Sequence, residues 1–201
     1  ALAVEFFPIG GTSKVIYPEL LAISGIQTEK GTLKKWDDLS DAQKEAAQKV
    51  IVRSSYKATL IHELGHNLGL RHNFMGSWDK DNFYTDEEAR ELGMEAAPAY
   101  SSIMDYSFSE FNQLKAFGKY DLAALRFGYA REVEVVEGDQ VKVEKITGTM
   151  TDFEENLPSG VERKPYEFCT DENAGLSSIC NRFDEGTSLV EVTKHLIERY
   201  K

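Results

Sequence analysis

Residues 56–76 read YKATLIHELGHNLGLRHNFMG and carry the clearest chemical pattern in the chain. Within them, His62, Glu63 and His66 form H-E-x-x-H. On a helix, residues four positions apart project from the same face, so the two imidazoles can bind one metal ion. Glu63 then lies beside the open coordination position, where a carboxylate can accept a proton from an activated water. The spacing predicts a metal-binding helix with a general base.

The pattern continues through Gly69 to His72 as H-E-x-x-H-x-x-G-x-x-H. Glycine tolerates a left-handed backbone, which ends a helix and turns the chain sharply. This turn is expected to bring His72 beneath the helix as a third ligand. Three neutral imidazoles plus water are typical of catalytic zinc, whereas structural zinc usually has a fourth protein ligand. The sequence therefore predicts one catalytic Zn²⁺ ion bound by His62, His66 and His72.

The alternative is a helix that carries histidines on its surface without binding metal. Five specified positions at fixed spacing argue against it. Four apolar positions are also expected to give the helix a buried face: Leu60, Ile61, Leu64 and Leu68.

The extended motif resembles that of the metzincin clan of zinc metalloproteases, in which a methionine-containing turn follows the ligands. Residues 101–106, SSIMDY, are similar to that turn. The resemblance implies that Met104 forms an apolar floor beneath the zinc. It also implies that Tyr106 can reach the metal or the oxyanion, as in the astacin-like and serralysin-like branches. Taken alone, Met104 also fits core packing, and Tyr106 fits a buried phenol with a hydrogen-bond partner.

A narrower resemblance rests on His72-Asn73-Phe74, the Met-Asp-Tyr turn and YDLAALRFGY at residues 120–129. Together these are similar to large exported bacterial metzincins over about residues 56–130. The resemblance implies a bacterial protein in the periplasm, on the cell surface or secreted. It also places Phe108, Phe111 and Leu114 at the wall of a specificity pocket, although all three fit a core equally well.

The activity that the resemblance implies is hydrolysis of peptide bonds in a polypeptide substrate. Glu63 would act as general base and then as proton donor to the leaving amine, with Tyr106 beside the oxyanion. The main alternative is a catalytically silent zinc-containing scaffold module of a larger exported protein. A protease with one partner and a zinc hydrolase of non-peptide amides are further alternatives. The intact Glu63 argues against the scaffold.

Composition limits the choice of partners. The chain has 201 residues, of which 41% are hydrophobic and 28% charged, and its net charge is −11. This charge argues against nucleic acid or an anionic membrane surface as a partner. No apolar run approaches the ~20 residues of a membrane span. The chain starts without a methionine or a signal-peptide pattern, so we expect further polypeptide upstream or downstream.

Two cysteines, Cys169 and Cys180, flank a ten-residue segment rich in loop-forming residues. In an exported protein this spacing predicts a disulfide-closed loop. Two free thiols are the alternative. Zinc binding by the pair is less expected because no second Cys or His lies close in sequence.

The expected fold class is α+β, with a metzincin-like zincin catalytic domain over residues 1–130. A C-terminal extension over residues 131–201 is expected to hold a β-hairpin, the cysteine loop and a terminal helix. Metzincins place a twisted sheet of several strands before the zinc helix, and only 61 residues precede His62. Part of this stretch reads as helix, so we expect an N-terminal sheet that is reduced or truncated.

Local signals predict the remaining elements. Residues 1–35 read as short strands and loops, followed by a helix from Asp41 to about Arg53, capped by Asp38 or Ser40. A break or kink is expected at Ser54-Ser55. Further helices are predicted after Thr85, over residues 120–130 and after Thr187 or Ser188. A hairpin is predicted over residues 132–153, with its turn at 137–139.

An acidic segment with Asp79, Asp81 and Asn82 contains the residue types that bind Ca²⁺. Its spacing fits no complete EF-hand loop, so a structural calcium site is not supported by a full motif. We expect a solvated acidic loop there.

Overall fold

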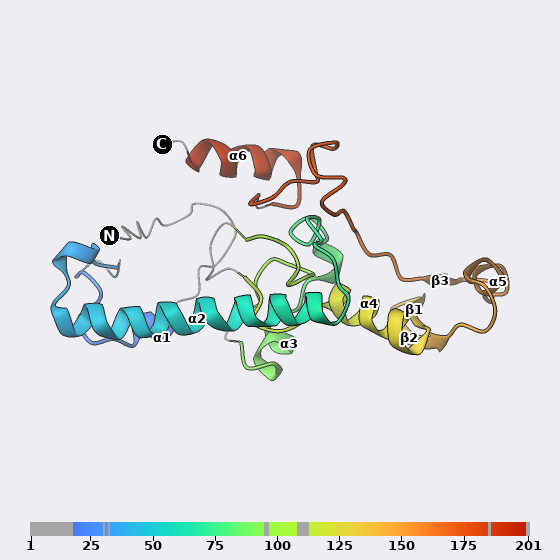
Figure 1. Cartoon of the computed structure of the whole chain (residues 1–201), viewed down its shortest axis with the longest axis horizontal. Helices are drawn as coiled ribbons and strands as arrows, with labels where there is room; N and C mark the ends of the chain where they lie inside the picture. The colour runs from blue at the N-terminus through green and yellow to red at the C-terminus, as the bar shows by residue number, and fades with distance from the viewer. Residues whose placement is uncertain are drawn as a thin grey trace.

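The computed structural model describes residues 18–29, 31, 33–94, 97–107, 113–184 and 186–199. These residues form helices and one small sheet, an arrangement compatible with an α+β zincin-like domain (Figure 1). The helices and strands are α1 (Pro18–Leu21), α2 (Asp41–Asn67), α3 (Asp86–Glu91), α4 (Lys119–Ala130), β1 (Glu132–Glu137), β2 (Gln140–Lys145), α5 (Met150–Glu155), β3 (Val161–Arg163) and α6 (Leu189–Arg199), with two short 3₁₀ turns at Trp36–Asp38 and Lys80–Asn82.

Helix α2 is a long helix that runs along the long axis of the molecule (Figure 1). It begins after Ser40, whose hydroxyl accepts from the Gln43 amide while the Gln43 side chain accepts from the Ser40 amide. The helix then continues for 27 residues, through Ser54 and Ser55, to Asn67. The predicted break at the two serines is therefore wrong. Extending a nucleated helix is easy, and serine in its interior costs well under about 1 kcal/mol relative to alanine.

The buried face of α2 differs from the predicted one. Leu60 and Leu64 are 53% and 47% exposed, so the prediction that they face the core is wrong. The buried positions on α2 are Ala47, Ala58, His62 and Gly65. Small side chains on this face let the segment that carries Met104 approach closely: a Cβ added to Gly65 would overlap the Met104 sulfur. Packing against that segment, rather than the apolar pattern, decides which face is buried.

Two apolar clusters flank α2. One holds Leu20, Ile26, Leu39 and Ala47 near the start of the helix. The other lies under its second half and holds Ala89, Met94, Tyr100, Ile103, Met104 and Leu114. Leu114 is thus part of the core, whereas Phe108 and Phe111 lie outside the described residues.

The start of α4 is tied to the methionine turn by one buried carboxylate. Asp121 accepts hydrogen bonds from the Ser102 hydroxyl (2.6 Å), the Ile103 amide (2.8 Å) and the Gly118 amide (2.7 Å). Burial raises the pKa of Asp121 to about 6. The predicted helix at 120–130 is confirmed as α4, and its first turn fixes the backbone next to Met104.

Gly118→Ala is expected to destabilise the fold by about 3 kcal/mol or more, because the new methyl group has no room. A Cβ at Gly118 would overlap the Ser101 carbonyl and lie 2.8 Å from the Ser102 nitrogen. Gly128→Ala, within α4, is the control. No atom lies within 4 Å of its Cβ position, so this change should be neutral or stabilise by about 0.5–1 kcal/mol. Urea unfolding of both variants checks this, and equal stabilities would contradict it.

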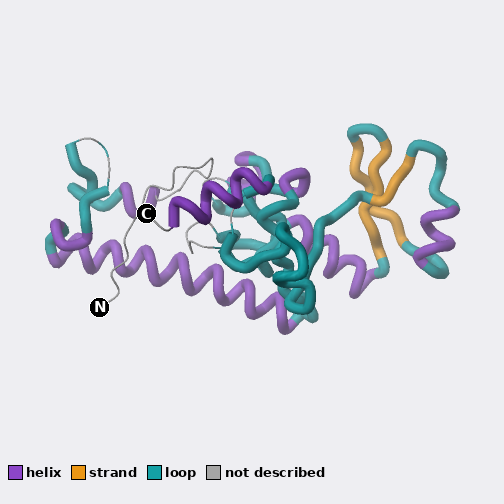
Figure 2. The backbone as a smooth tube through the Cα atoms, turned by 90° about the horizontal axis from the view of Figure 1, so that it is seen from above, coloured by secondary structure: helices purple, strands orange, loops and turns teal. Residues whose placement is uncertain are grey.

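The sheet lies at one end of the molecule, beyond α4 (Figures 1 and 2). Its strand order is β2-β1-β3, and both pairings are antiparallel. The predicted hairpin is confirmed but ends at Lys145 rather than at residue 153: Glu137 pairs with Gln140, and Gly138 has a positive φ of 60° in the turn. Strand β3 and helix α5 were not expected, because segments of three and six residues carry too little periodicity.

Helices α3 and α6 begin where the sequence predicts. Thr85 and Glu88 form a capping box at α3, and Gly93 has a positive φ of 74° after it. The Ser188 hydroxyl accepts from the Glu191 amide at the start of α6. On α6, Val192 is buried, while Leu189 and Ile197 are more than half exposed.

The acidic segment at 79–82 is not the solvated loop that was expected. Asp79 and Asn82 are only 5% and 2% exposed. The Asn82 side-chain amide donates to Asp79 Oδ1 (2.7 Å) and to the Pro165 carbonyl (3.0 Å). Burial raises the pKa of Asp79. The returning chain near residue 165 covers these side chains, which composition could not reveal.

Residues 1–17, where short strands were predicted, lie outside the described residues. In the described part before α2, extended pairing is limited to the bridge between Gln27 and Leu33. Among the helices of the described residues, none combines the length and apolar composition that a membrane span requires.

Candidate metal centre and active site

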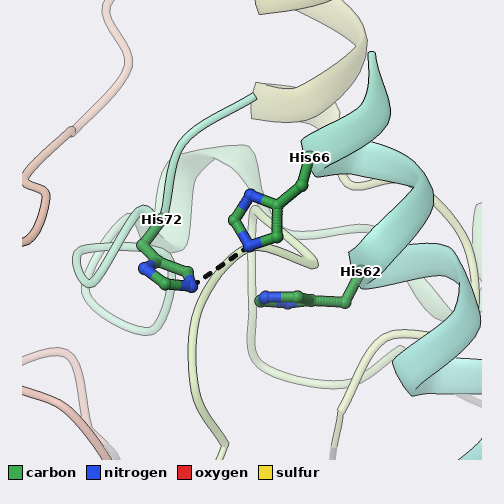
Figure 3. Close-up of side chains that lie close together, drawn as sticks. All are labelled: His62, His66 and His72. Atoms are coloured by element: carbon green, nitrogen blue, oxygen red, sulfur yellow. Dashed lines mark hydrogen bonds between the residues drawn. The ribbon is translucent and has the colours of Figure 1, made fainter. Parts of the chain in front are cut away.

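Three histidine side chains converge at the C-terminal end of α2 (Figure 3). His62 and His66 project from the last two turns of the helix, and His72 approaches from the chain that follows it. Gly69 has a φ of 90°, and the Leu70 amide donates back to the Gly65 carbonyl (2.9 Å), which reverses the chain as predicted. One nitrogen from each ring lies within 4.8 Å of the others. The turn at Gly69 thus completes the three-histidine cluster.

The outer nitrogen of each ring has an acceptor as its partner. His62 Nδ1 lies 2.8 Å from the Ile103 carbonyl, and His66 Nδ1 lies 3.0 Å from the Leu70 carbonyl. His72 Nδ1 lies 2.8 Å from Asp171 Oδ2. Carbonyl and carboxylate oxygens only accept, so each Nδ1 must carry the proton. In the neutral rings, the three Nε2 lone pairs then face one another.

Facing lone pairs repel unless a cation lies between them, and this arrangement fits a bound metal ion. His66 Nε2 and His72 Nε2 are 3.2 Å apart. A tetrahedral zinc ion with Zn–N distances of about 2.0–2.1 Å holds its nitrogens about 3.3 Å apart. Burial lowers the pKa of His62, which favours the neutral form that binds metal. The three histidines therefore form a metal-binding set consistent with zinc.

Glu63 is exposed and follows His62 directly on the helix. Its carboxylate lies close enough to influence both His62 and Tyr106. Burial lowers the pKa of His62, and the Glu63 charge opposes that shift. For Tyr106, burial raises the pKa, and the charges of Asp171 and Glu63 raise it further. A solvent-accessible carboxylate beside the histidines suits a group that exchanges protons with water.

Met104 packs against the part of α2 that carries His62 and His66. Its side chain is fully buried against Gly65, between His62 and His66 in the helix. The backbone on either side of it is also engaged: the Ile103 carbonyl accepts from His62, and the Met104 carbonyl accepts from the Asn73 amide (3.0 Å). This segment therefore orients the His62 ring and contacts Asn73, which follows His72.

Tyr106 reaches the metal-facing side of the cluster. Its hydroxyl lies 2.8 Å from His72 Nε2, and its ring stacks on His62 at 5.6 Å between centroids. The Tyr106 ring also stacks on Phe183, at 5.3 Å between centroids. The backbone is anchored by Asp105, which accepts from the amides of Ser77 and Tyr106. Burial raises the pKa of Asp105 to about 8.

The predicted disulfide between Cys169 and Cys180 is present, and both cysteines are buried beside Phe74 and Met75. The loop that it closes reaches the metal centre. Asp171 lies in this loop, and Arg182 follows it closely. Sequence reasoning missed both residues as parts of the site, because 99 positions separate Asp171 from His72. The two cysteines predicted the loop, but not that it contacts His72.

Residues 43–201 match a protein family described as Met-zincin. Comparisons with curated proteins and with solved structures find no match. The family match covers the three histidines, the methionine turn and the cysteine loop.

Proposed function

Because the chain belongs to the Met-zincin family, we propose that it is a zinc-dependent endopeptidase that hydrolyses peptide bonds. The observation that carries this proposal is the set of three Nε2 lone pairs turned toward one point by the partners of the three Nδ1 atoms. His62, His66 and His72 are the proposed ligands. When bound, zinc supplies a water of lowered pKa, near about 7, and polarises the substrate carbonyl.

Glu63 is the proposed general base. Its exposed carboxylate lies one residue from His62 and is free to accept the proton of the attacking water. The same carboxyl group then donates that proton to the leaving amine, so Glu63 returns to its starting state. A glutamate in this position serves the proton transfers without being a ligand.

Tyr106 is the proposed donor to the substrate carbonyl oxygen as negative charge develops on it. The hydroxyl already lies at the metal-facing nitrogen of His72 and donates toward it. Burial raises the pKa of Tyr106, so the phenol keeps its proton at neutral pH. A preorganised donor at this point stabilises the transition state more than the ground state. Met104 holds the helix and the turn together beneath it.

For the rest of the chain, we propose a catalytic domain over residues 1–130 with a reduced or truncated N-terminal sheet, and an extension over residues 131–201. The extension contacts the site through the cysteine loop: the Phe74 amide donates to the Cys169 carbonyl (2.8 Å). The disulfide fits an oxidising compartment, so we place the protein outside the cytoplasm.

The test is cleavage of casein, an unstructured protein, by the zinc-loaded full chain, followed by mass spectrometry. We expect internal peptide bonds to be cut, activity to be lost after treatment with 1,10-phenanthroline, and activity to return when Zn²⁺ is added back. Cleavage that survives removal of the metal would contradict the proposal. A chain that binds one zinc ion tightly and cuts neither casein nor a diverse peptide library would favour the silent scaffold instead.

A further inference from the structure

The three proposed ligands do not have equivalent outer partners. Two of them, His62 and His66, donate from Nδ1 to backbone carbonyls. His72 instead donates to a carboxylate, Asp171 Oδ2, at 2.8 Å. His72 is also the ligand that does not belong to α2, so the helix does not position its ring. The ligand with the least support from regular structure thus has the one charged partner among the three.

Asp171 is itself held in place. Arg182 Nη2 donates to Asp171 Oδ1 (2.7 Å), so each carboxylate oxygen has a partner. The Arg182 guanidinium also lies over the ring of Phe74, 5.0 Å from its centroid. Phe74 in turn stacks on His72 at 5.2 Å between centroids. These contacts form a closed ring of neighbours around the outer side of the His72 imidazole.

The backbone that carries Asp171 is fixed to the backbone that carries His72. The Phe74 amide donates to the Cys169 carbonyl (2.8 Å), and the Asn73 side chain joins the same two segments through Glu167 and Cys169. Only Thr170 separates Cys169 from Asp171, and the disulfide to Cys180 closes the loop that contains them. His72 and Asp171 therefore each lie within two residues of a hydrogen bond that joins their two backbone segments.

We propose that Asp171 is a positioning residue for the third metal ligand, and that the disulfide-closed loop 169–180 together with Arg182 is the unit that holds it. The inference rests on the proposed metal centre. The carboxylate fixes the tautomer that leaves Nε2 free, restrains rotation of the His72 ring and makes the imidazole a stronger donor to a cation. Loss of such an outer partner typically lowers metal affinity about 10–100-fold.

The expected effect is on metal affinity rather than on the stability of the metal-free fold. Asp171 and Arg182 are exposed, so solvent screens their charges and the pair contributes little to folding. A side chain that only supported the loop would show the opposite pattern, with a lower unfolding temperature and an unchanged affinity for zinc. The two roles can therefore be separated by experiment.

The chain offers a matched control in the adjacent residue. Glu172 lies in the same loop, is exposed, and forms an ion pair with Arg71 at 2.6 Å. Arg71 directly precedes His72, and both carboxylate oxygens of Glu172 accept hydrogen bonds from Arg71 rather than from a histidine ring. Asp171→Asn and Glu172→Gln each remove one negative charge from the loop, so a general electrostatic effect changes both variants equally. Only a positional effect distinguishes them.

The experiment measures the zinc affinity of the metal-free full chain by competition with a chromophoric chelator, for wild type, Asp171→Asn and Glu172→Gln. Co²⁺ absorption spectra report the ligand geometry, and thermal unfolding without metal reports the fold. We expect Asp171→Asn to bind Zn²⁺ about 10–100-fold more weakly, to alter the Co²⁺ spectrum and to unfold at an unchanged temperature. Glu172→Gln should resemble wild type in all three measurements.

Several outcomes would overturn the proposal. These are equal zinc affinities for Asp171→Asn and wild type, equal losses in Asp171→Asn and Glu172→Gln, and failure of the wild type to bind zinc. Absence of peptidase activity would not, because the readout is metal binding: a wild type that binds zinc but cleaves nothing refutes the proposed function alone. The two failures are thus distinguishable.

Double variants test whether the disulfide-closed loop acts on zinc binding through Asp171. Cys169→Ser with Cys180→Ser opens the loop, and Arg182→Gln is the milder variant if the opened chain does not fold. We expect either change to weaken zinc binding in wild type but to have little further effect in Asp171→Asn, because both act through the same carboxylate. Additive losses would show that the loop does not act through Asp171.

Discussion

Glu63→Gln is expected to lower kcat about 10²–10⁴-fold while leaving one zinc ion bound per chain. Glutamine has the same shape as glutamate but cannot accept the proton of the attacking water. The metal-binding set consists of His62, His66 and His72 and does not include Glu63, so the metal should remain bound. Steady-state cleavage of a peptide substrate and metal analysis of the same sample check both parts of this prediction.

Glu45→Gln is the control for this change. Glu45 lies on the same helix, is exposed, and pairs with Lys49 at 2.7 Å, far along α2 from the histidines. The control should keep both activity and zinc. Retention of more than about a tenth of the wild-type kcat in Glu63→Gln would show that another group acts as the base. Loss of zinc together with activity would assign Glu63 to the metal site instead.

His66→Ala is expected to remove most of the affinity for zinc and, with it, the stabilisation that zinc confers. A ligand that binds the folded state stabilises it by about 2.7 kcal/mol at a concentration of 100 times Kd. In wild type, added Zn²⁺ should therefore raise the unfolding midpoint. Loss of a direct ligand should weaken zinc binding by more than the roughly 100-fold that is typical for loss of a hydrogen-bond partner of a ligand. The zinc-induced shift of the midpoint should then disappear.

The fourth histidine provides the matched control. His195 is buried on α6, and its atoms do not belong to the cluster of three Nε2 nitrogens. His195→Ala is expected to lower the midpoint without zinc, because a buried side chain is truncated, but to keep the zinc-induced shift. Thermal unfolding of both variants with and without Zn²⁺ measures the difference. A zinc-induced shift of equal size in wild type and His66→Ala would contradict the assignment of ligands.

Much of the local structure could be read directly from the chain. The capping pairs Ser40–Gln43 and Thr85–Glu88, the left-handed turn at Gly69 and the hairpin around Gly138 all depend on residues within a few positions of one another. The metal-binding set was readable for the same reason, since His62, His66 and His72 lie within eleven residues. Met104 and Tyr106 required the resemblance to metzincins as well.

Burial was harder to predict, because it depends on what packs against each element. Leu60 and Leu64 fit a buried helical face but are exposed, since the segment with Met104 packs on the other side, against Gly65. Asp79 and Asn82 read as a solvated loop, yet the chain near Pro165 covers them. In both cases the deciding partner lies far away in the sequence.

The proposed ligand set, the proposed general base and the turn at Gly69 follow from short-range spacing, because a helix places residues four apart on one face and glycine permits the reversal after it. The outer support of His72 does not follow from spacing. Asp171, which contacts the His72 imidazole, lies 99 positions after it, and Arg182, which contacts Asp171, lies further still. The sheet and part of the disulfide-closed loop lie between His72 and these two residues in the sequence. Only the tertiary structure brings these residues into contact, because no interaction between neighbours in the sequence determines it.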